Sequence, residues 1–141
     1  GHLARFAAEQ GVCLAIEPLP AGSGTNFINT TEQAFSFARQ IGSPGLQVNV
    51  DLGTIIENGE DIRRIFTSGH LDLISHVHLS EPGLAPIQKR DIYVRTIELL
   101  KEIGYQNYVS IEMLKFPEVK LIQGVINYFR GIIKESCPKE S

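Results

Sequence analysis

The 141-residue sequence lacks long apolar runs, clustered positive charge and a cysteine framework. Its apolar runs are a few residues long, whereas a helix that crosses a bilayer needs about 20 apolar residues, so we expect no membrane contact. The 13 Lys and Arg residues are dispersed and the net charge is −3, which gives nucleic-acid binding no electrostatic support. The amino terminus has no signal-peptide pattern, and Cys13 and Cys137 are expected to be free thiols. We therefore expect a cytoplasmic protein.

What the sequence does contain is a regular alternation of two periodicities. Short β-branched runs, typical of buried strands, alternate with apolar residues three and four apart, typical of helices. The pattern predicts strands at 12–17, 46–51, 74–79 and 108–113. It predicts helices at 3–10, 30–41, 61–68, from about 89 to the stop at Gly104, and 117–134. Strands that alternate with helices form parallel sheets. We expect an α/β fold, a parallel (βα)₄ unit in a single domain over residues 1–141, with a disordered tail at 135–141.

Helix ends and helix faces are predicted by the same patterns. Thr30 and Gln33 have the spacing of a capping box. Apolar residues at helical spacing should face the core. These stripes are Leu3, Phe6 and Ala7; Ala34, Phe37, Ala38 and Ile41; Ile92, Thr96, Leu99 and Ile103; and Ile122, Ile126, Phe129 and Ile133.

One polar residue lies at the end of each predicted strand, and the four are Glu17, Asp51, His78 and Glu112. Each follows a β-branched apolar residue, and side chains alternate between the faces of a strand. We therefore expect the four polar groups to share one face at the carboxyl ends of the strands, where α/β barrels place their chemistry. Each residue alone is also explained as a helix cap, a loop residue or a core histidine. Three buried carboxylates brought together without a cation would be costly.

This set of side chains is suited to a divalent metal. Carboxylate oxygens with one imidazole favour Mn²⁺ or Mg²⁺, with Co²⁺ and Zn²⁺ as alternatives. His76 shares the face of His78 but lies one layer deeper, and Glu81 follows the same strand. We expect both to contact substrate; a core position for His76 and a surface turn for Glu81 are the alternatives.

Five segments resemble the xylose isomerase-like TIM barrel superfamily of sugar phosphate isomerases and epimerases, and they are EPLP, NFINT, VDLGT, HVHLSEP and GYQNYVSIEM. This superfamily includes the ketose 3-epimerases, the inosose dehydratases and the endonuclease IV branch. The resemblance covers nearly the whole chain but only the carboxy-terminal half of the (β/α)₈ barrel, strands five to eight. Thr54 departs from the pattern, because many relatives have a histidine there that contacts substrate.

The resemblance implies that Glu17, Asp51, His78 and Glu112 bind the metal and that Glu17 and Glu112 exchange the substrate proton. The implied activity is isomerisation or epimerisation of a small sugar through an enediolate. A half-barrel has two open sheet edges, so we expect either a homo-oligomer or an amino-terminal half-barrel as partner. The alternative is a truncated or degenerate, non-catalytic half-barrel that binds metal or a partner chain. An inosose dehydratase-like lyase and an endonuclease IV-like nuclease are less favoured.

Overall fold

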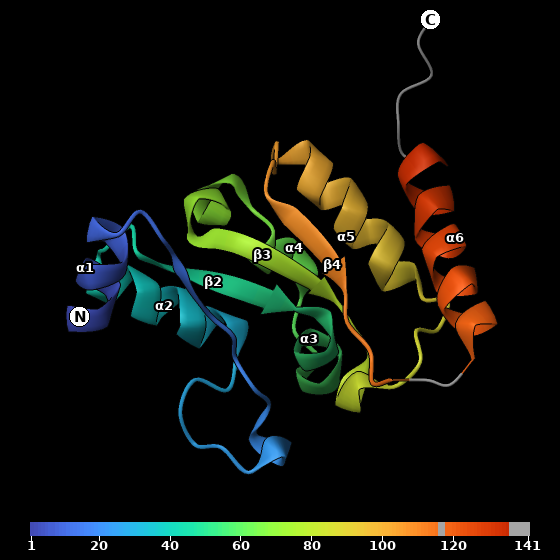
Figure 1. Ribbon diagram of the computed structural model, residues 1–141, viewed down its shortest axis with the longest axis horizontal. Coiled ribbons are helices and arrows are strands. Elements are labelled where there is room, and N and C mark those ends of the chain that lie inside the picture. The colour runs from blue at the N-terminus through green and yellow to red at the C-terminus, as the bar shows by residue number, and fades with distance from the viewer. Residues whose placement is uncertain (116–117, 136–141) are drawn as a thin grey trace, which may run out of the picture.

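The computed structural model describes residues 1–115 and 118–135. At its centre is one sheet of four parallel strands in the order β1-β2-β3-β4. Figure 1 shows helices α2, α4 and α5 on the same side of this sheet. The predicted parallel (βα)₄ architecture is confirmed. The strands are β1 (Leu14–Ile16), β2 (Leu46–Asp51), β3 (Ile74–Leu79) and β4 (Tyr108–Ile111).

Helices connect the strands and flank the sheet. They are α1 (His2–Glu9), α2 (Thr31–Ile41), α3 (Leu52–Asn58), α4 (Ile62–Ile65), α5 (Asp91–Glu102) and α6 (Val119–Glu135). Three short 3₁₀ segments complete the connections, and they are Ala21–Ser23, Ser68–Leu73 and Pro82–Leu84. None of the helices in the described part of the chain has the length and apolar character needed to span a membrane.

The two faces of the sheet have different environments. On the face that the helices cover, Val48, Val50 and Val77 are fully buried. On the opposite face, His76 and His78 of β3 are only half-buried. In a closed barrel this second face would line the interior. The hydrophobic core therefore lies between the sheet and its helices, and the polar face is left open.

The structure corrects several predicted boundaries. Strands β2 and β3 have the predicted bounds, whereas the edge strands β1 and β4 are shorter because each has a partner on one side only. The predicted helix at 61–68 is α4 followed by a 3₁₀ segment, since the backbone leaves helical geometry at Phe66. Helix α3 was not predicted. Glu135 is the last residue of α6, and the rest of the predicted tail, like Cys137, lies outside the described residues.

The helix faces are also partly different from those predicted. The capping box of α2 is present, with both the Thr30 and the Gln33 side chains engaged. Helix α5 buries a face about one residue away from the predicted one, because Tyr93 fills the space between the helix and Phe129 of α6. The residues that these helices actually bury are Ala4 and Ala7 in α1; Thr31, Ala34, Phe35 and Ala38 in α2; Tyr93, Thr96, Ile97 and Leu100 in α5; and Val125, Phe129 and Ile132 in α6.

Helix α1 rests directly on the backbone before β2. A Cβ on Gly45 would lie 2.0 Å from the carbonyl oxygen of Ala4 and 2.6 Å from the nitrogen of Ala8. Backbone atoms cannot move aside as a flexible side chain can, so this close approach requires glycine. Of the three side chains predicted for the α1 stripe, Ala7 is buried, whereas Leu3 and Phe6 are exposed.

A buried carboxylate organises the connection from β3 to α5. Glu81 is 2% exposed, and its oxygens accept hydrogen bonds from the Gln88 N–H, the Arg90 Nε and the Tyr93 hydroxyl at 2.9–3.0 Å. Burial raises the pKa of Glu81, but the hydrogen bonds from Arg90, Gln88 and Tyr93 outweigh it and hold the pKa below its usual range. The ionised carboxylate thus stabilises the loop that follows β3.

Replacing Gly45 by alanine should displace α1 and destabilise the fold by about 1–3 kcal/mol, the usual cost of forcing extra volume into a packed contact. Gly131→Ala is the matched control. Its Cβ would meet no atom within 4 Å, and alanine in a helix interior is more stable than glycine by about 0.5–1 kcal/mol. Urea unfolding followed by circular dichroism measures both. Equal stability of Gly45→Ala and wild type would contradict the close contact.

Glu81→Gln should lower stability at pH 7 by about 1–3 kcal/mol, because it removes the buried charge that accepts the hydrogen bonds of Gln88, Arg90 and Tyr93. The folded pKa of Glu81 lies below the unfolded value, so its contribution is present above the unfolded pKa and is lost as the pH falls through the folded one. The difference between variant and wild type should therefore shrink below about pH 4.

Glu98→Gln provides the control for this comparison. Glu98 pairs with Arg95 on the exposed surface of α5, and such pairs contribute about 0–1 kcal/mol. Thermal unfolding from pH 3 to pH 8 measures both variants. A Glu81→Gln penalty that stays constant across this range would show that packing, and not charge, is responsible.

Candidate metal centre at the carboxyl ends of the strands

The four residues predicted at the strand ends come together. Glu17 follows β1, Asp51 ends β2, His78 lies near the end of β3, and Glu112 follows β4. Each offers one ligand atom, and these atoms all lie within 4.8 Å of one another. Residues from all four strands therefore converge on one point at the open face.

The strands are staggered, so the four residues are not level in the sheet. Asp51 pairs with His78, but His78 pairs with Ser110, two residues before Glu112. On the other side, Ile16 pairs with Val48, which places Glu17 beside Asn49. The shorter side chains, Asp51 and His78, come from the central strands, and the longer glutamates reach inward from both edges.

Asp51 is held by contacts from two directions. One carboxylate oxygen accepts the Thr54 N–H at 2.7 Å and caps helix α3, and the other accepts the hydroxyl of Ser80. Ser80 in turn accepts the N–H of Gly53 at 2.8 Å. Asp51 is 5% exposed, so its carboxylate is fixed in orientation before any ligand binds.

His78 lies between the two glutamates. Its Nδ1 is 3.0 Å from Glu112 Oε2 and 3.6 Å from Glu17 Oε2. Burial and the nearby charge of Asp51 raise the pKa of Glu17, against the opposing effects of His78 and of a hydrogen bond from Asn49. The cluster therefore concentrates negative charge that a cation would relieve.

The donor set fits a single divalent cation. Three carboxylates and one imidazole supply four ligands, and Mn²⁺ or Mg²⁺ prefers oxygen ligands at about 2.0–2.3 Å. Opposite ligands around such an ion are about 4–4.6 Å apart, so the separations here would need to close only slightly. Among the described residues, this is the group of His, Cys, Asp and Glu side chains that meets the geometry.

The other two predicted site residues lie differently. His76 is half-buried one layer deeper, with its Nε2 2.8 Å from the Ser110 hydroxyl and its ring edge-on to His78. Glu81 is engaged by Arg90 and Tyr93 and does not join the cluster. His76 thus lies where a substrate in the open face could reach it, whereas Glu81 organises the neighbouring loop.

Thr54, which departs from the pattern of the resemblance, has a structural contact here. Its side chain is buried, and its hydroxyl donates to the carbonyl oxygen of Pro18 at 3.1 Å. This bond joins the start of α3 to the segment that follows Glu17. Asn49 and Ser80 were not predicted as site residues, and no motif in the sequence distinguishes them.

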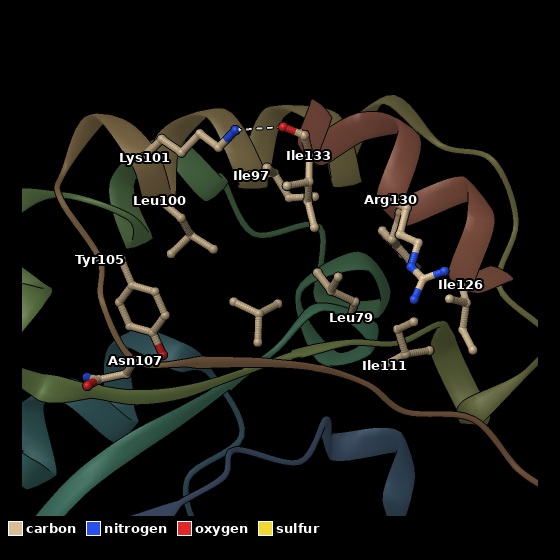
Figure 2. Close-up of a pocket in the computed structure, with 12 residues that line it drawn as sticks. Leu79, Ile97, Leu100, Lys101, Tyr105, Asn107, Ile111, Ile126, Arg130 and Ile133 are labelled. Atoms are coloured by element: carbon tan, nitrogen blue, oxygen red, sulfur yellow. Dashed lines mark hydrogen bonds between the residues drawn. The ribbon is translucent and has the colours of Figure 1, made fainter. Parts of the chain in front are cut away.

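A large apolar cavity lies elsewhere. Figure 2 shows it between the outer face of β4 and helices α5 and α6. Its volume is about 340 Å³. Its lining is mainly aliphatic and includes Leu79 and Ile111, and on its rim Lys101 donates to the Ile133 carbonyl. None of the four cluster residues lines it. The cavity adjoins the open edge of the sheet and is separate from the polar site.

Comparisons with solved structures show the same fold in proteins about twice as long. They include 3-keto-D-glucoside 4-epimerase from E. coli (TM-score 0.73, 19% identity, 96% of this chain and 50% of that chain). D-psicose 3-epimerase in the presence of D-fructose has a TM-score of 0.77 at 17% identity, over 94% of this chain and 53% of that one. An AP endonuclease of family 2 from Brucella melitensis has a TM-score of 0.73 at 21% identity, over 91% and 49%.

These identities establish the fold alone, and this chain spans about half the length of each structure. No curated protein sequence matches it. The family model described as xylose isomerase-like TIM barrel matches residues 1–132. With four parallel strands and a polar cluster at their carboxyl ends, the chain belongs to the xylose isomerase-like TIM barrel family.

Proposed function

We propose that the complete protein is a metal-dependent isomerase or epimerase that acts on a ketose or a related small polyhydroxy carbonyl compound. The observation that carries this proposal is the convergence of Glu17, Asp51, His78 and Glu112 within 4.8 Å. The epimerases among the structural neighbours support the choice of chemistry.

The metal would be held by all four residues, with Mn²⁺ or Mg²⁺ favoured and Co²⁺ or Zn²⁺ as alternatives. When bound, it would polarise the substrate carbonyl and stabilise the negative charge of the enediolate. Asp51 is restrained by Thr54 and Ser80, so its role is to hold the ion and not to move a proton.

Proton transfer is assigned to Glu17 and Glu112. They follow the two edge strands, and His78 lies between them, so the two carboxylates reach the substrate site from opposite sides. One would remove the proton next to the carbonyl and the other would return it, which gives epimerisation. Reprotonation at the neighbouring carbon would give isomerisation. His76, deeper in the same face, is assigned to substrate binding.

The second candidate function is a non-catalytic half-barrel that binds a metal or a partner chain. The open edges at β1 and β4 favour it, because relatives with this fold are about twice as long. The two candidates differ in turnover: the half-barrel would bind the metal but would not exchange substrate protons.

Mn²⁺ binding and proton exchange test the two parts of the proposal separately. Calorimetric titration should detect one Mn²⁺ per chain, with binding lost in Asp51→Ala. In deuterated water, the complete protein with all eight βα units should exchange a proton of D-fructose or D-tagatose for solvent deuterium. Glu17→Gln and Glu112→Gln should slow this exchange by about 10²–10⁴-fold, the usual contribution of a positioned base, while each keeps an oxygen ligand for the ion.

The results distinguish the alternatives. Metal binding without exchange in the complete protein would overturn the isomerase proposal and support a non-catalytic, metal-binding role. Exchange at the wild-type rate in both glutamine variants would overturn the two-glutamate mechanism. Equal Mn²⁺ binding by wild type and Asp51→Ala would leave the cluster as a polar feature of the fold.

We further infer that the open edges pair with four additional βα units, which would close the barrel. Exposed apolar side chains line both edges: Leu14 of β1 is 42% exposed and Tyr108 of β4 is 78% exposed. Unpaired parallel edges of this kind invite pairing with another chain. In a complete protein, the occupant would be an amino-terminal half-barrel of the same polypeptide; for the isolated chain, it would be a second copy.

The isolated chain should therefore self-associate through its edges. Sedimentation velocity over a range of concentrations should detect dimers or larger species, and Leu14→Lys should shift the population toward monomer by placing a charge at the β1 edge. Gln40→Lys, on the exposed end of α2, adds the same charge away from the edges and should leave association unchanged. A monomer at all concentrations would contradict edge pairing in the isolated chain.

A further inference from the structure

Asn49 is a buried amide in the middle of the candidate metal centre. It lies on β2 two residues before Asp51, on the same face of the sheet, and is 6% exposed. Its Nδ2 donates to Glu17 Oε2 at 2.5 Å. The same nitrogen is 3.1 Å from Nδ1 and 3.4 Å from Nε2 of His78. One side chain thus contacts two of the four proposed ligands.

The other half of the amide is unsatisfied. The Oδ1 of Asn49 is buried and has no hydrogen-bond partner. Turning the amide over would place this oxygen against the carboxylate of Glu17 and would replace a donor–acceptor contact with two acceptors. The contact with Glu17 therefore fixes the orientation of the amide, although one buried oxygen remains unpaired.

A neutral donor has a particular advantage at this position. A lysine or arginine would neutralise Glu17 and repel an incoming cation, and an aspartate would repel Glu17 itself. An aliphatic residue would fill the space without restraining either ligand. The amide restrains Glu17 and leaves the negative charge of the cluster intact.

Asn49 also restricts the ring of His78. Its nitrogen is nearly equidistant from the two ring nitrogens, so it packs against the face of the ring. This contact limits rotation of the imidazole, and Nδ1 remains directed toward Glu112 at 3.0 Å.

We propose that Asn49 is a positioning residue, which holds Glu17 and His78 in the arrangement that receives the divalent cation. The inference rests on the proposed metal site and adds to it a residue that is not itself a ligand. Residues that orient metal ligands in this way typically change metal affinity by 10- to 100-fold when they are replaced.

The test compares Asn49→Leu with Thr96→Val. Leucine is close to asparagine in size but has neither donor nor acceptor. Thr96 of α5 provides the matched control, because its Oγ1 is also buried without a partner and it lies outside the cluster. For each variant, Mn²⁺ affinity is measured by calorimetry and the thermal midpoint is measured with chelator present.

Asn49→Leu should bind Mn²⁺ about 10- to 100-fold more weakly than wild type. Its metal-free thermal midpoint should change little, since the lost hydrogen bond to Glu17 is offset by the removal of the unpaired buried oxygen. Thr96→Val should keep the wild-type affinity. If Asn49→Leu does not fold, Asn49→Ala, which deletes the amide without adding a branched side chain, replaces it and should show the same loss of affinity.

Two results would overturn the inference while leaving the metal site in place. One is wild-type Mn²⁺ affinity in the folded Asn49 variant. The other is a lowered metal-free midpoint with unchanged affinity, which would give Asn49 a structural role only. Failure of wild type to bind Mn²⁺ is a different outcome: it would overturn the proposed metal site, and the positioning role with it.

Discussion

The carboxylate of Asp51 is the contact on which the arrangement of the strand ends depends. It accepts the N–H of Thr54, in the first turn of helix α3, and the hydroxyl of Ser80, which follows β3. The Thr54 side chain extends the connection to Pro18, next to Glu17. One buried residue thus joins the ends of β1, β2 and β3. A carboxylate with its accepting oxygens already directed in this way is positioned by the fold and loses little freedom when it binds a cation.

The same interactions explain why like charges can be held so close together. Neutral donors surround the carboxylates: backbone N–H groups and a hydroxyl at Asp51, and an amide at Glu17. These groups stabilise ionised oxygens without cancelling their charge. They do not remove the repulsion completely, because the pKa of Glu17 remains raised by burial and by Asp51. A divalent ion would relieve the remaining repulsion between the carboxylates. Ion binding would therefore also stabilise the folded arrangement of the strand ends.

The sequence predicted the centre of the fold better than its edges. Strands β2 and β3 were predicted with their observed bounds, because a buried β-branched run flanked by turn residues is a local signal. Helix α3 was missed because it begins immediately after β2, with its cap supplied by the last strand residue, Asp51. The four cluster residues were identifiable because each ends a predicted strand. The contacts of Asn49 were not, since they depend on the stagger that places Glu17 beside it, and stagger between strands is a tertiary property.

Two of the four cluster residues come from central strands and two follow edge strands. Asp51 and His78 come from strands with a partner on each side, whereas the proposed proton-transfer residues follow β1 and β4, which have three and four residues and one partner each. A short edge strand restrains its end less than a central strand does, because half of its backbone groups have no ladder partner. Pairing of β1 and β4 with further strands would therefore fix the two glutamates much more than Asp51 and His78. Under the proposed mechanism, Asp51 and His78 would hold the cation in positions set by contacts within the described chain, and the accuracy of proton transfer by the two glutamates would depend on closing the barrel around them.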